Sequence, residues 1–471
     1  MQQDHRRARA QSQPDSVSED VEKQTVSISE EVKDDAVSPY AVDPDEERRL
    51  VRRIDLRIVP ASMLIYLLCS LDRSNIGNAK ILNSDAGHSL MQSVHISNGQ
   101  YLTALVIFFV SYTLFETPSN YMLKRFRPSR WIAFLMFAWG AMTIILGAIH
   151  NFGGLVAVRF LLGMFEAGLF PGMVYVLTFW YRPEERALRI ALILASATLG
   201  GAFGGAIAYG VGKLDGAHGL EAWRYRIPVI GGRAVVCRRR PRLRALATGR
   251  LKGVASLGHQ RITWAEARAT LVDWRLYVHY LTYITISVPF SSMSLFSPTI
   301  VAGLGYKGLD AQLFTVPPYA IAFVITVAVA WVSDRYEKRS LGTSISMAIA
   351  GACFIVEGAL PSDSFKLRYV FFIIALSFAF ACIPPLLSWL TANLHTTGAS
   401  TLGVPLNVSI GQVGQIIGVY IYKSNESPGY PTGHYTNAGF LLVGALAVLG
   451  LRVRELPVKH AGIHYKKITV P

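Results

Sequence analysis

Charge is scarce in this sequence. Only 16% of its 471 residues are Asp, Glu, Lys or Arg, while 51% are hydrophobic and the mean hydropathy is +0.34. Soluble domains carry about a quarter of charged residues, so this composition excludes an ordinary soluble protein. Cysteine is scarce too. The four cysteines stand at spacings that suit neither a disulfide framework nor a metal site, and we expect them to be small buried side chains.

Several motifs are missing as well. No nucleophile stands with a base, no spacing suits metal ligands and no glycine-rich loop suits a phosphate, so we expect neither an enzyme nor a cofactor. The Arg-rich stretch 233–253 lacks a recognition fold around it, which argues against nucleic acid as a partner. The amino terminus lacks the basic start and apolar centre of a secretory signal.

Long apolar runs are abundant instead. A helix needs about 20 mainly apolar residues to cross a bilayer. Eleven runs approach that length: 58–82, 100–122, 131–149, 153–178, 187–211, 276–302, 312–333, 341–360, 369–391, 399–422 and 437–453. The sequence therefore predicts an all-α, multi-pass membrane protein embedded in a lipid bilayer. The acidic, Ser-rich segment 1–47 is predicted to be a disordered tail, and 454–471 a second tail.

Basic residues gather in alternate loops. The segments "RRLVRRIDLR", "KRFRPSR", "YRPEERALR" and "SDRYEKRS" are basic, whereas the loops between them are nearly neutral. Membrane proteins retain Lys and Arg on the cytoplasmic side of short loops. We therefore expect the amino terminus and both tails in the cytoplasm.

Few charges lie inside the apolar runs, and most belong to the first half of the chain. They are Asp72 and Arg73 in the first run, Glu116 in the second, Arg159 and Glu166 in the fourth, and Glu357 near the end of a later one. An ionised side chain near the bilayer centre costs at least ~2.5–3.5 kcal/mol, so such residues usually face a cavity or a partner.

Helix geometry relates four of these charges. Arg159 and Glu166 are seven residues apart and share one helix face, whereas Asp72 and Arg73 point about 100° apart. Two acids and two bases sum to zero, and protonating one acid leaves a positive pocket, as carrying an anion together with a proton requires. The alternative is a structural ion-pair cluster that joins two helices.

These residues and loops resemble a known family. The stretch "LDRSNIGNAK", the pattern Arg159, Gly163, Glu166, Ala167 and the loops "KRFRPSR" and "SDRYEKR" resemble the major facilitator superfamily. More narrowly, "PFSSMSLFSPTIVAGLGYKGLDAQLFTVPPYA" and "NVSIGQVGQIIGVYIY" resemble fungal anion:cation symporters of the allantoate permease-like group, and within it the nicotinic-acid permease branch. The resemblance covers about residues 50–225 and 262–453.

The resemblance implies a major facilitator fold with a twelve-helix plan in two six-helix halves and one substrate site between them. The halves would span 48–226 and 274–453. It implies a monomeric, proton-coupled symporter, expected in the plasma membrane, that imports a small organic anion such as a carboxylate vitamin or nitrogen source. Allantoate, nicotinate, pantothenate and biotin suit the pocket equally well.

The resemblance also assigns roles to the buried charges. On the matching positions, Arg73 would hold the substrate carboxylate, and Asp72 and Glu166 would exchange protons. Arg159 would bind substrate as well, and would pair with Glu166 when that acid is ionised.

Two further sets of residues are candidates. Asn407, Gln412 and Gln415 would contact substrate from the second half, although amides in membrane helices also simply bond between helices. The basic loops contain the residues with which the family latches its cytoplasmic side: Arg130, Asp334, Arg335 and Arg339. The alternative for these is a solvated loop that only obeys the positive-inside rule.

The family pattern fails between residues 227 and 261. The loops "KRFRPSR" and "SDRYEKRS" share a side only if six crossings separate them, and the sequence offers five. After "WRYR", the apolar part 227–237 is too short to cross, and many Arg residues follow it. We therefore predict a shortened or missing sixth helix within 227–273.

Three explanations fit this failure: an error in the gene model, a disabling change, or a divergent cytoplasmic loop with a compressed helix. The alternative function is accordingly a nutrient receptor that does not transport, or a non-functional product.

Overall fold

The computed structural model describes residues 44–126, 128–177, 179–181, 183–215, 222–224, 268, 270–306, 308–394 and 397–460. These residues are almost entirely helical and include no strand, which confirms the all-α prediction. Eleven of the described spans are long and apolar enough to cross a membrane, as the sequence predicts. The predicted anomaly at 227–261 and residues 1–43 and 461–471 of the predicted tails lie outside the described residues. Residues 44–47 and 454–460, which were also assigned to the tails, belong to helices instead, because each neighbouring helix extends beyond its apolar run.

The first half contains five spans. They are α2 (Pro44–Ile81), α4 (Asn98–Arg125), α5 (Pro128–Leu146), α6 (Phe152–Glu166) continued by α7 (Leu169–Leu177), and α8 (Pro183–Gly212). The short helices η1 (Ser84–Ala86) and α3 (Leu90–Ser93) connect α2 to α4. Polar caps fix where these helices begin: Ser97 and Gln100 form a capping box at α4, and Asn151 Oδ1 accepts from Gly154 N at 2.7 Å at α6.

The second half contains six spans. They are α12 (Trp274–Gly303), α13 (Gly308–Leu313) with α14 (Val316–Arg335), α15 (Arg339–Ala359), α16 (Phe365–Ala381) with α17 (Ile383–Asn393), α18 (Thr397–Tyr420) and α19 (Pro431–His460). The short helix η3 (Ser424–Glu426) lies between the last two. Pro384 and Pro385 occupy the first turn of α17, where their missing N–H groups leave no hydrogen bond unmade, so the junction with α16 accommodates both prolines without a large cost.

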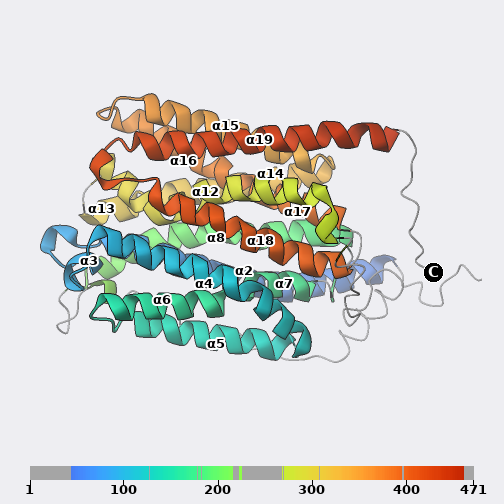
Figure 1. Ribbon diagram of the computed structural model, residues 1–471, viewed down its shortest axis with the longest axis horizontal. Coiled ribbons are helices and arrows are strands. Elements are labelled where there is room, and N and C mark those ends of the chain that lie inside the picture. Colours follow the sequence, from blue (N-terminus) through green and yellow to red (C-terminus); the bar gives the residue numbers. More distant parts are fainter. Residues whose placement is uncertain are drawn as a thin grey trace, which may run out of the picture.

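The spans run alternately between two ends of the bundle (Figure 1). One end carries α3 and α13, on the left of the figure, and is named the α3 end here. The opposite end, named the loop end, carries the α4–α5, α7–α8 and α14–α15 connections, which are the basic loops. These loops therefore share one end, as the positive-inside interpretation requires.

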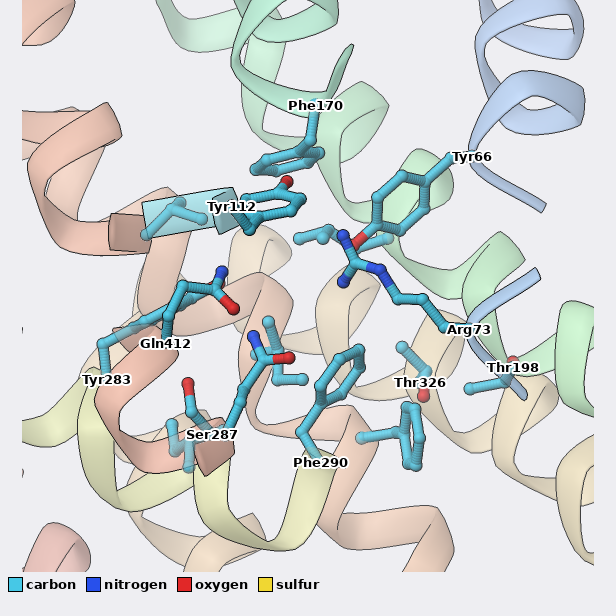
Figure 2. Close-up of a pocket in the computed structure, with 16 residues that line it drawn as sticks. Tyr66, Arg73, Tyr112, Phe170, Thr198, Tyr283, Ser287, Phe290, Thr326 and Gln412 are labelled. Carbon is cyan, nitrogen blue, oxygen red and sulfur yellow. The ribbon is translucent and has the colours of Figure 1, made fainter. Parts of the chain in front are cut away.

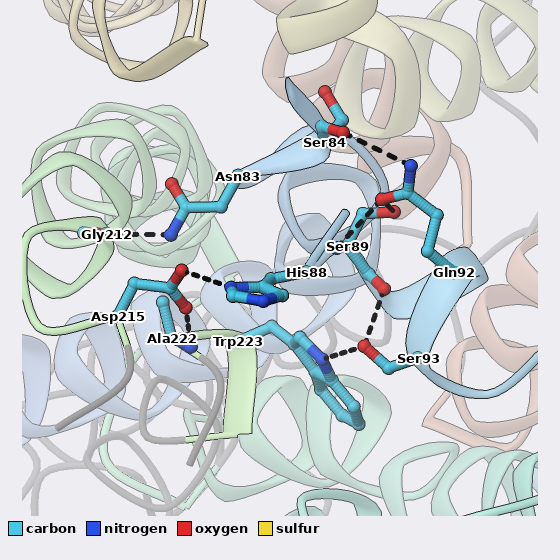
Figure 3. A network of polar contacts seen from close by, with 10 residues as sticks. All are labelled: Asn83, Ser84, His88, Ser89, Gln92, Ser93, Gly212, Asp215, Ala222 and Trp223. Atoms are coloured by element: carbon cyan, nitrogen blue, oxygen red, sulfur yellow. Dashed lines mark hydrogen bonds and ion pairs between the residues drawn. The ribbon is translucent and has the colours of Figure 1, made fainter. Parts of the chain in front are cut away.

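A polar network ties residues after α8 to the α3 end (Figure 3). His88 Nδ1 lies 2.7 Å from Asp215 Oδ2, and Trp223 Nε1 donates to Ser93 Oγ at 3.1 Å. Trp274, by contrast, begins α12 at the loop end. Trp223 and Trp274 thus lie at opposite ends of the bundle.

The two halves meet along the helix pairs α2–α12, α4–α18 and α8–α14. Small residues permit this approach: a Cβ on Gly77 would lie 2.2 Å from the carbonyl oxygen of Leu295, and one on Gly205 would lie 2.2 Å from Thr315 Oγ1. Gln312 Nε2 also donates to the Asn78 carbonyl across the interface at 3.3 Å. The halves are therefore in close contact at the α3 end.

Candidate functional site

A cavity lies between the two halves and is lined by residues of both (Figure 2). Its wall is mainly aromatic and apolar with a few polar groups, which is typical of small-molecule sites. The first half contributes Tyr66, Arg73, Tyr112, Phe170, Leu194 and Thr198. The second half contributes Tyr283, Ile286, Ser287, Phe290, Thr326, Phe380, Ile383, Val408, Gln412 and Gln415. Arg73 is the only charged residue among these described lining residues.

Arg73 reaches the cavity from α2. Its Nε donates to Glu166 Oε1 at 2.6 Å, and its guanidinium carbon lies 5.0 Å from the centre of the Tyr112 ring. Figure 2 shows the guanidinium directed into the cavity beside Tyr66 and Tyr112. The described contact with Glu166 uses Nε, so the two terminal nitrogens present a fork of donors that suits a carboxylate.

Glu166 ends α6 and is almost fully buried, with 1% of its side chain exposed. The sequence analysis expected Arg159 to pair with it, and this expectation was wrong: the ion pair is with Arg73. Seven residues place Arg159 and Glu166 on one face but about 10 Å apart along the axis, too far for a direct contact. Arg73 approaches from the neighbouring helix and takes the position.

Arg159 lies in α6 with 2% exposure. Its guanidinium carbon is 5.9 Å from the Phe108 ring centre, and among the described residues its Nε and Nη2 find no hydrogen-bond acceptor. It is not among the described residues that line the cavity. A buried guanidinium with unused donors makes this part of the first half positive, which favours a nearby anion.

Asp72 points away from Arg73, as the 100° separation predicts. Its Oδ2 accepts from Thr143 Oγ1 on α5 at 2.9 Å, and its Oδ1 accepts from Asn75 Nδ2 at 3.2 Å. Asp72 is 4% exposed and does not belong to the described cavity wall. The two neighbours on α2 therefore serve different surroundings: one faces the cavity, and the other faces α5.

The three amide candidates of α18 also differ in whether they line the cavity. Gln412 and Gln415 line the cavity, whereas Asn407 does not. Gln412 is 1% exposed, and neither atom of its amide has a hydrogen-bond partner within the described part of the chain. Its donor and its acceptor are therefore both available to a ligand.

Two of the four predicted gate residues form an ion pair. Arg339 Nε donates to Asp334 Oδ1 at 2.7 Å, and Arg339 Nη1 donates to the Ser388 carbonyl of α17 at 3.4 Å. Arg130 and Arg335 are exposed. The structure thus joins one predicted pair at the loop end of the second half and leaves the other two residues in solvated positions.

Sequence reasoning missed the matching pair of the first half. Arg189 at the start of α8 donates to both carboxylate oxygens of Asp55 at 2.8 and 2.7 Å, and its guanidinium lies 4.4 Å from the Tyr181 ring centre. The charged segments "RRIDLR" and "EERALR" contain both partners, but sequence spacing alone does not pair residues of different helices.

A buried polar cluster in the second half was also missed. Glu357 of α15, Arg368 of α16 and His434 of α19 are at most 1% exposed. His434 Nδ1 lies 3.5 Å from Glu357 Oε2, and Arg368 Nη2 donates to the Gly429 carbonyl at 2.6 Å. Arg368 and His434 stand just outside the apolar runs, which is why Glu357 alone was noticed. The cluster contributes no residue to the described cavity wall.

Comparison with known proteins gives consistent matches. A family model described as Major Facilitator Superfamily matches residues 62–419. The MFS transporter prlL of Fungal sp. (strain NRRL 50135) is 49% identical over 451 residues, which cover 91% of each chain. The MFS-type transporter cnsO of Penicillium expansum is 33% identical over 433 residues, or 85% of this chain and 81% of its own.

Solved structures agree on the fold. A bacterial homolog of the human lysosomal transporter Spinster, in an inward-facing and unoccupied conformation, superposes with a TM-score of 0.62 over 85% of this chain and 97% of its own. The two sequences are 16% identical, so this likeness concerns the fold alone.

Proposed function

The chain belongs to the Major Facilitator Superfamily of membrane transporters, and from this premise we propose that it is a proton-coupled symporter for a small organic anion. It would import a carboxylate, such as a vitamin or nitrogen source, across the plasma membrane as a monomer by alternating access, with its amino terminus in the cytoplasm. The narrower resemblance to allantoate and nicotinic-acid permeases supports a carboxylate substrate.

The observation that carries the proposal is the position of Arg73. It is the only charged residue in the described cavity wall, and its terminal nitrogens face the cavity. A guanidinium binds a carboxylate through two parallel, charge-assisted hydrogen bonds. Tyr66 and Tyr112 supply aromatic surface beside the guanidinium, and Gln412 supplies a neutral donor and acceptor from the other half. Together these groups suit a small, flat or compact anion.

The pair between Arg73 and Glu166 supplies a coupling mechanism. A substrate carboxylate on the terminal nitrogens of Arg73 competes with Glu166, which is bound to Nε, for the positive charge of the same guanidinium and so draws Arg73 away from Glu166. A buried carboxylate that has lost its cation is costly, so Glu166 then takes up a proton. One anion and one proton enter together, and the charge of the site is unchanged. When the anion leaves, Glu166 releases the proton and pairs with Arg73 again.

Asp72 is the second acid of this proposal. Thr143 and Asn75 hold its two oxygens, and Arg159 acts on it electrostatically. In the proposed mechanism Asp72 exchanges the proton with Glu166 or with the water that enters when the halves part. Arg159 keeps the surroundings positive while the acids are protonated and anion is bound.

Uptake by cells that express the chain tests this function. Labelled nicotinate, allantoate, pantothenate and biotin are offered at acidic and at neutral external pH, with and without a protonophore. The proposal expects one of them to accumulate more at acidic pH and to be lost when the protonophore is added. Accumulation that changes neither with external pH nor with the protonophore would contradict symport.

The alternative function rests on residues 227–261. If this segment cannot provide the sixth crossing, the protein is a receptor that binds without transport, or an inactive product. Sequencing of the transcript across the segment tests the gene model, and binding of a labelled carboxylate without uptake would favour the receptor.

A further inference from the structure

Glu116 of α4 is a fully buried carboxyl at the contact between the two halves. Its exposed fraction is 0%, and Ser409 Oγ of α18 donates to its Oε2 at 2.8 Å. Its Oε1 has no hydrogen-bond partner in the described part of the chain. A single neutral hydroxyl from the opposite half is therefore the only described side-chain donor to this carboxyl.

The charged and titratable groups around Glu116 do not neutralise it. Arg73 of α2 acts on it electrostatically, but that guanidinium is already paired with Glu166. Tyr112, one turn earlier on α4, and Tyr283 of α12 interact with Glu116 electrostatically, and a protonated phenol carries no charge that could neutralise it. An ionised Glu116 would thus be a nearly unpaired charge in this closed contact, which is unfavourable away from water.

We propose that Glu116 binds a proton when α4 and α18 close on each other and releases it when they part. The proton comes from water and returns to water, so the step needs no other reactant. Closure removes the carboxyl from solvent and favours its neutral form, whereas opening hydrates it and favours the carboxylate. By linkage, acidity favours the closed contact to the same extent that closure favours the proton.

We name the proton-dependent contact between Glu116 and Ser409 the latch. The position of Glu116 indicates which end of the bundle the latch controls. Glu116 is nine residues from the last residue of α4, Arg125, and eighteen from its first, Asn98, so it lies nearer the loop end. At the α3 end, the halves are joined by close glycine contacts and by Gln312, without a described acid at those contacts. Opening at the loop end is therefore the movement that is sensitive to the proton on Glu116.

This inference rests on the proposed alternating access but on no particular substrate, and it is separate from the roles of Asp72 and Glu166. Tyr121 at the end of α4 and Tyr336 after α14 are exposed, lie at the loop end and belong to different halves. Spin labels at these two positions report how far the halves part. The full chain is labelled in lipid nanodiscs with Cys237 replaced by serine, because the other three cysteines are buried.

In the wild type, acidification is expected to raise the fraction with the short label distance several-fold. Glu116→Gln is expected to show the short distance at both acidic and neutral pH, because its amide is neutral and still accepts from Ser409. Glu116→Asp keeps a carboxyl and should keep the response to pH. Glu357→Gln, which removes an equally buried carboxyl inside one half, should behave as the wild type.

A wild type whose distances ignore pH would overturn the latch, and so would a Glu116→Gln variant that responds to pH as the wild type does. Uptake assays judge the proposed symport separately. A chain that transports no carboxylate but shows the Glu116-dependent response would refute the substrate proposal and leave this inference standing.

Discussion

The two halves of the bundle use buried charge differently. The first half places Arg73, Glu166, Asp72 and Arg159 inside its candidate membrane spans, and Arg73 lines the cavity. The second half places its buried cluster of Glu357, Arg368 and His434 near the α3 end, beside the α18–α19 connection, and faces the cavity with neutral side chains such as Gln412 and Gln415.

This difference has a physical advantage for a protein whose halves move. A charge that is buried between two moving parts is desolvated and solvated again in each cycle, which is costly unless a partner moves with it. If one half holds the cation and its counter-ion together, the pair stays intact when the halves move without substrate, and the substrate carboxylate replaces the counter-ion when they move with it. The other half then needs only hydrogen-bonding groups that form and break contacts at about 1 kcal/mol each.

The largest expected effect comes from removing the buried cation that the first half directs into the cavity. Arg73→Ala removes the cation that faces the cavity and leaves Glu166 buried without its partner, a change that costs about 3–5 kcal/mol in comparable pairs. We expect apparent affinity for the carboxylate to fall by at least ~100-fold. Direct binding of labelled substrate to the purified protein measures this.

Two variants control this experiment. Arg73→Lys should recover only part of the affinity, because an ammonium lacks the planar fork. Arg57→Ala removes an exposed arginine of the same helix and should bind as the wild type. If Arg73→Ala binds with unchanged affinity, the cavity assignment fails.

The next effect separates the acids of the two halves. Asp72→Asn should abolish accumulation of substrate against its gradient, while exchange of substrate across the membrane remains, because the neutral amide carries no proton. Glu357→Gln, within the cluster of the second half, should leave accumulation intact. Counterflow and net uptake in proteoliposomes measure the two properties, and equal loss in both variants would show that coupling is not confined to the first half.

A smaller effect is expected from removing a neutral side chain that the second half contributes to the cavity wall. Gln412→Ala removes a donor and an acceptor from the cavity wall, so we expect KM to rise up to about tenfold, which corresponds to about 1.4 kcal/mol. The response to pH should not change. Asn407→Ala, in the same helix but outside the described cavity wall, should raise KM less. A larger effect in Asn407→Ala would reverse the orientation assigned to α18.

The smallest expected effect concerns the hydrogen bonds that Asp215 accepts at the α3 end. Burial would raise the pKa of Asp215, but hydrogen bonds from His88 and from the Ala222 N–H hold it below its usual value. The depressed pKa means that this carboxylate stabilises the fold above the ordinary value of about 3.9, and that the contribution is lost as pH falls below it.

Asp215→Asn should therefore melt slightly lower than the wild type at neutral pH, by an amount that corresponds to about 1 kcal/mol or less. The two proteins should converge in acid. Thermal unfolding in detergent at several pH values checks this, and a constant difference at all pH values would mean that charge is not the cause.

Much of the fold was predictable because its signals are local. A helix that crosses lipid needs a long apolar run, so eleven spans were recognised and confirmed. The divergence of Asp72 and Arg73 followed from their adjacent places on one helix, and the structure bears it out.

Contacts between helices were less predictable. The partner of Glu166 was assigned from its own helix, but α2 brings Arg73 closer than α6 brings Arg159. The difference between Gln412 and Asn407 depends on how α18 is rotated toward the other half, which spacing within α18 does not determine. His434 and Arg368 escaped notice because they stand at the ends of their spans, where charge is ordinary in sequence and unusual only once burial is known.

The central claim is that the carboxylate displaces Glu166 from Arg73 and that Glu166 then carries the proton. The most direct test follows proton entry with a pH-sensitive dye inside proteoliposomes when the transported carboxylate is added outside. The account predicts acidification in the wild type, and none in Glu166→Gln although that variant still exchanges labelled carboxylate. Undiminished acidification in Glu166→Gln would contradict it.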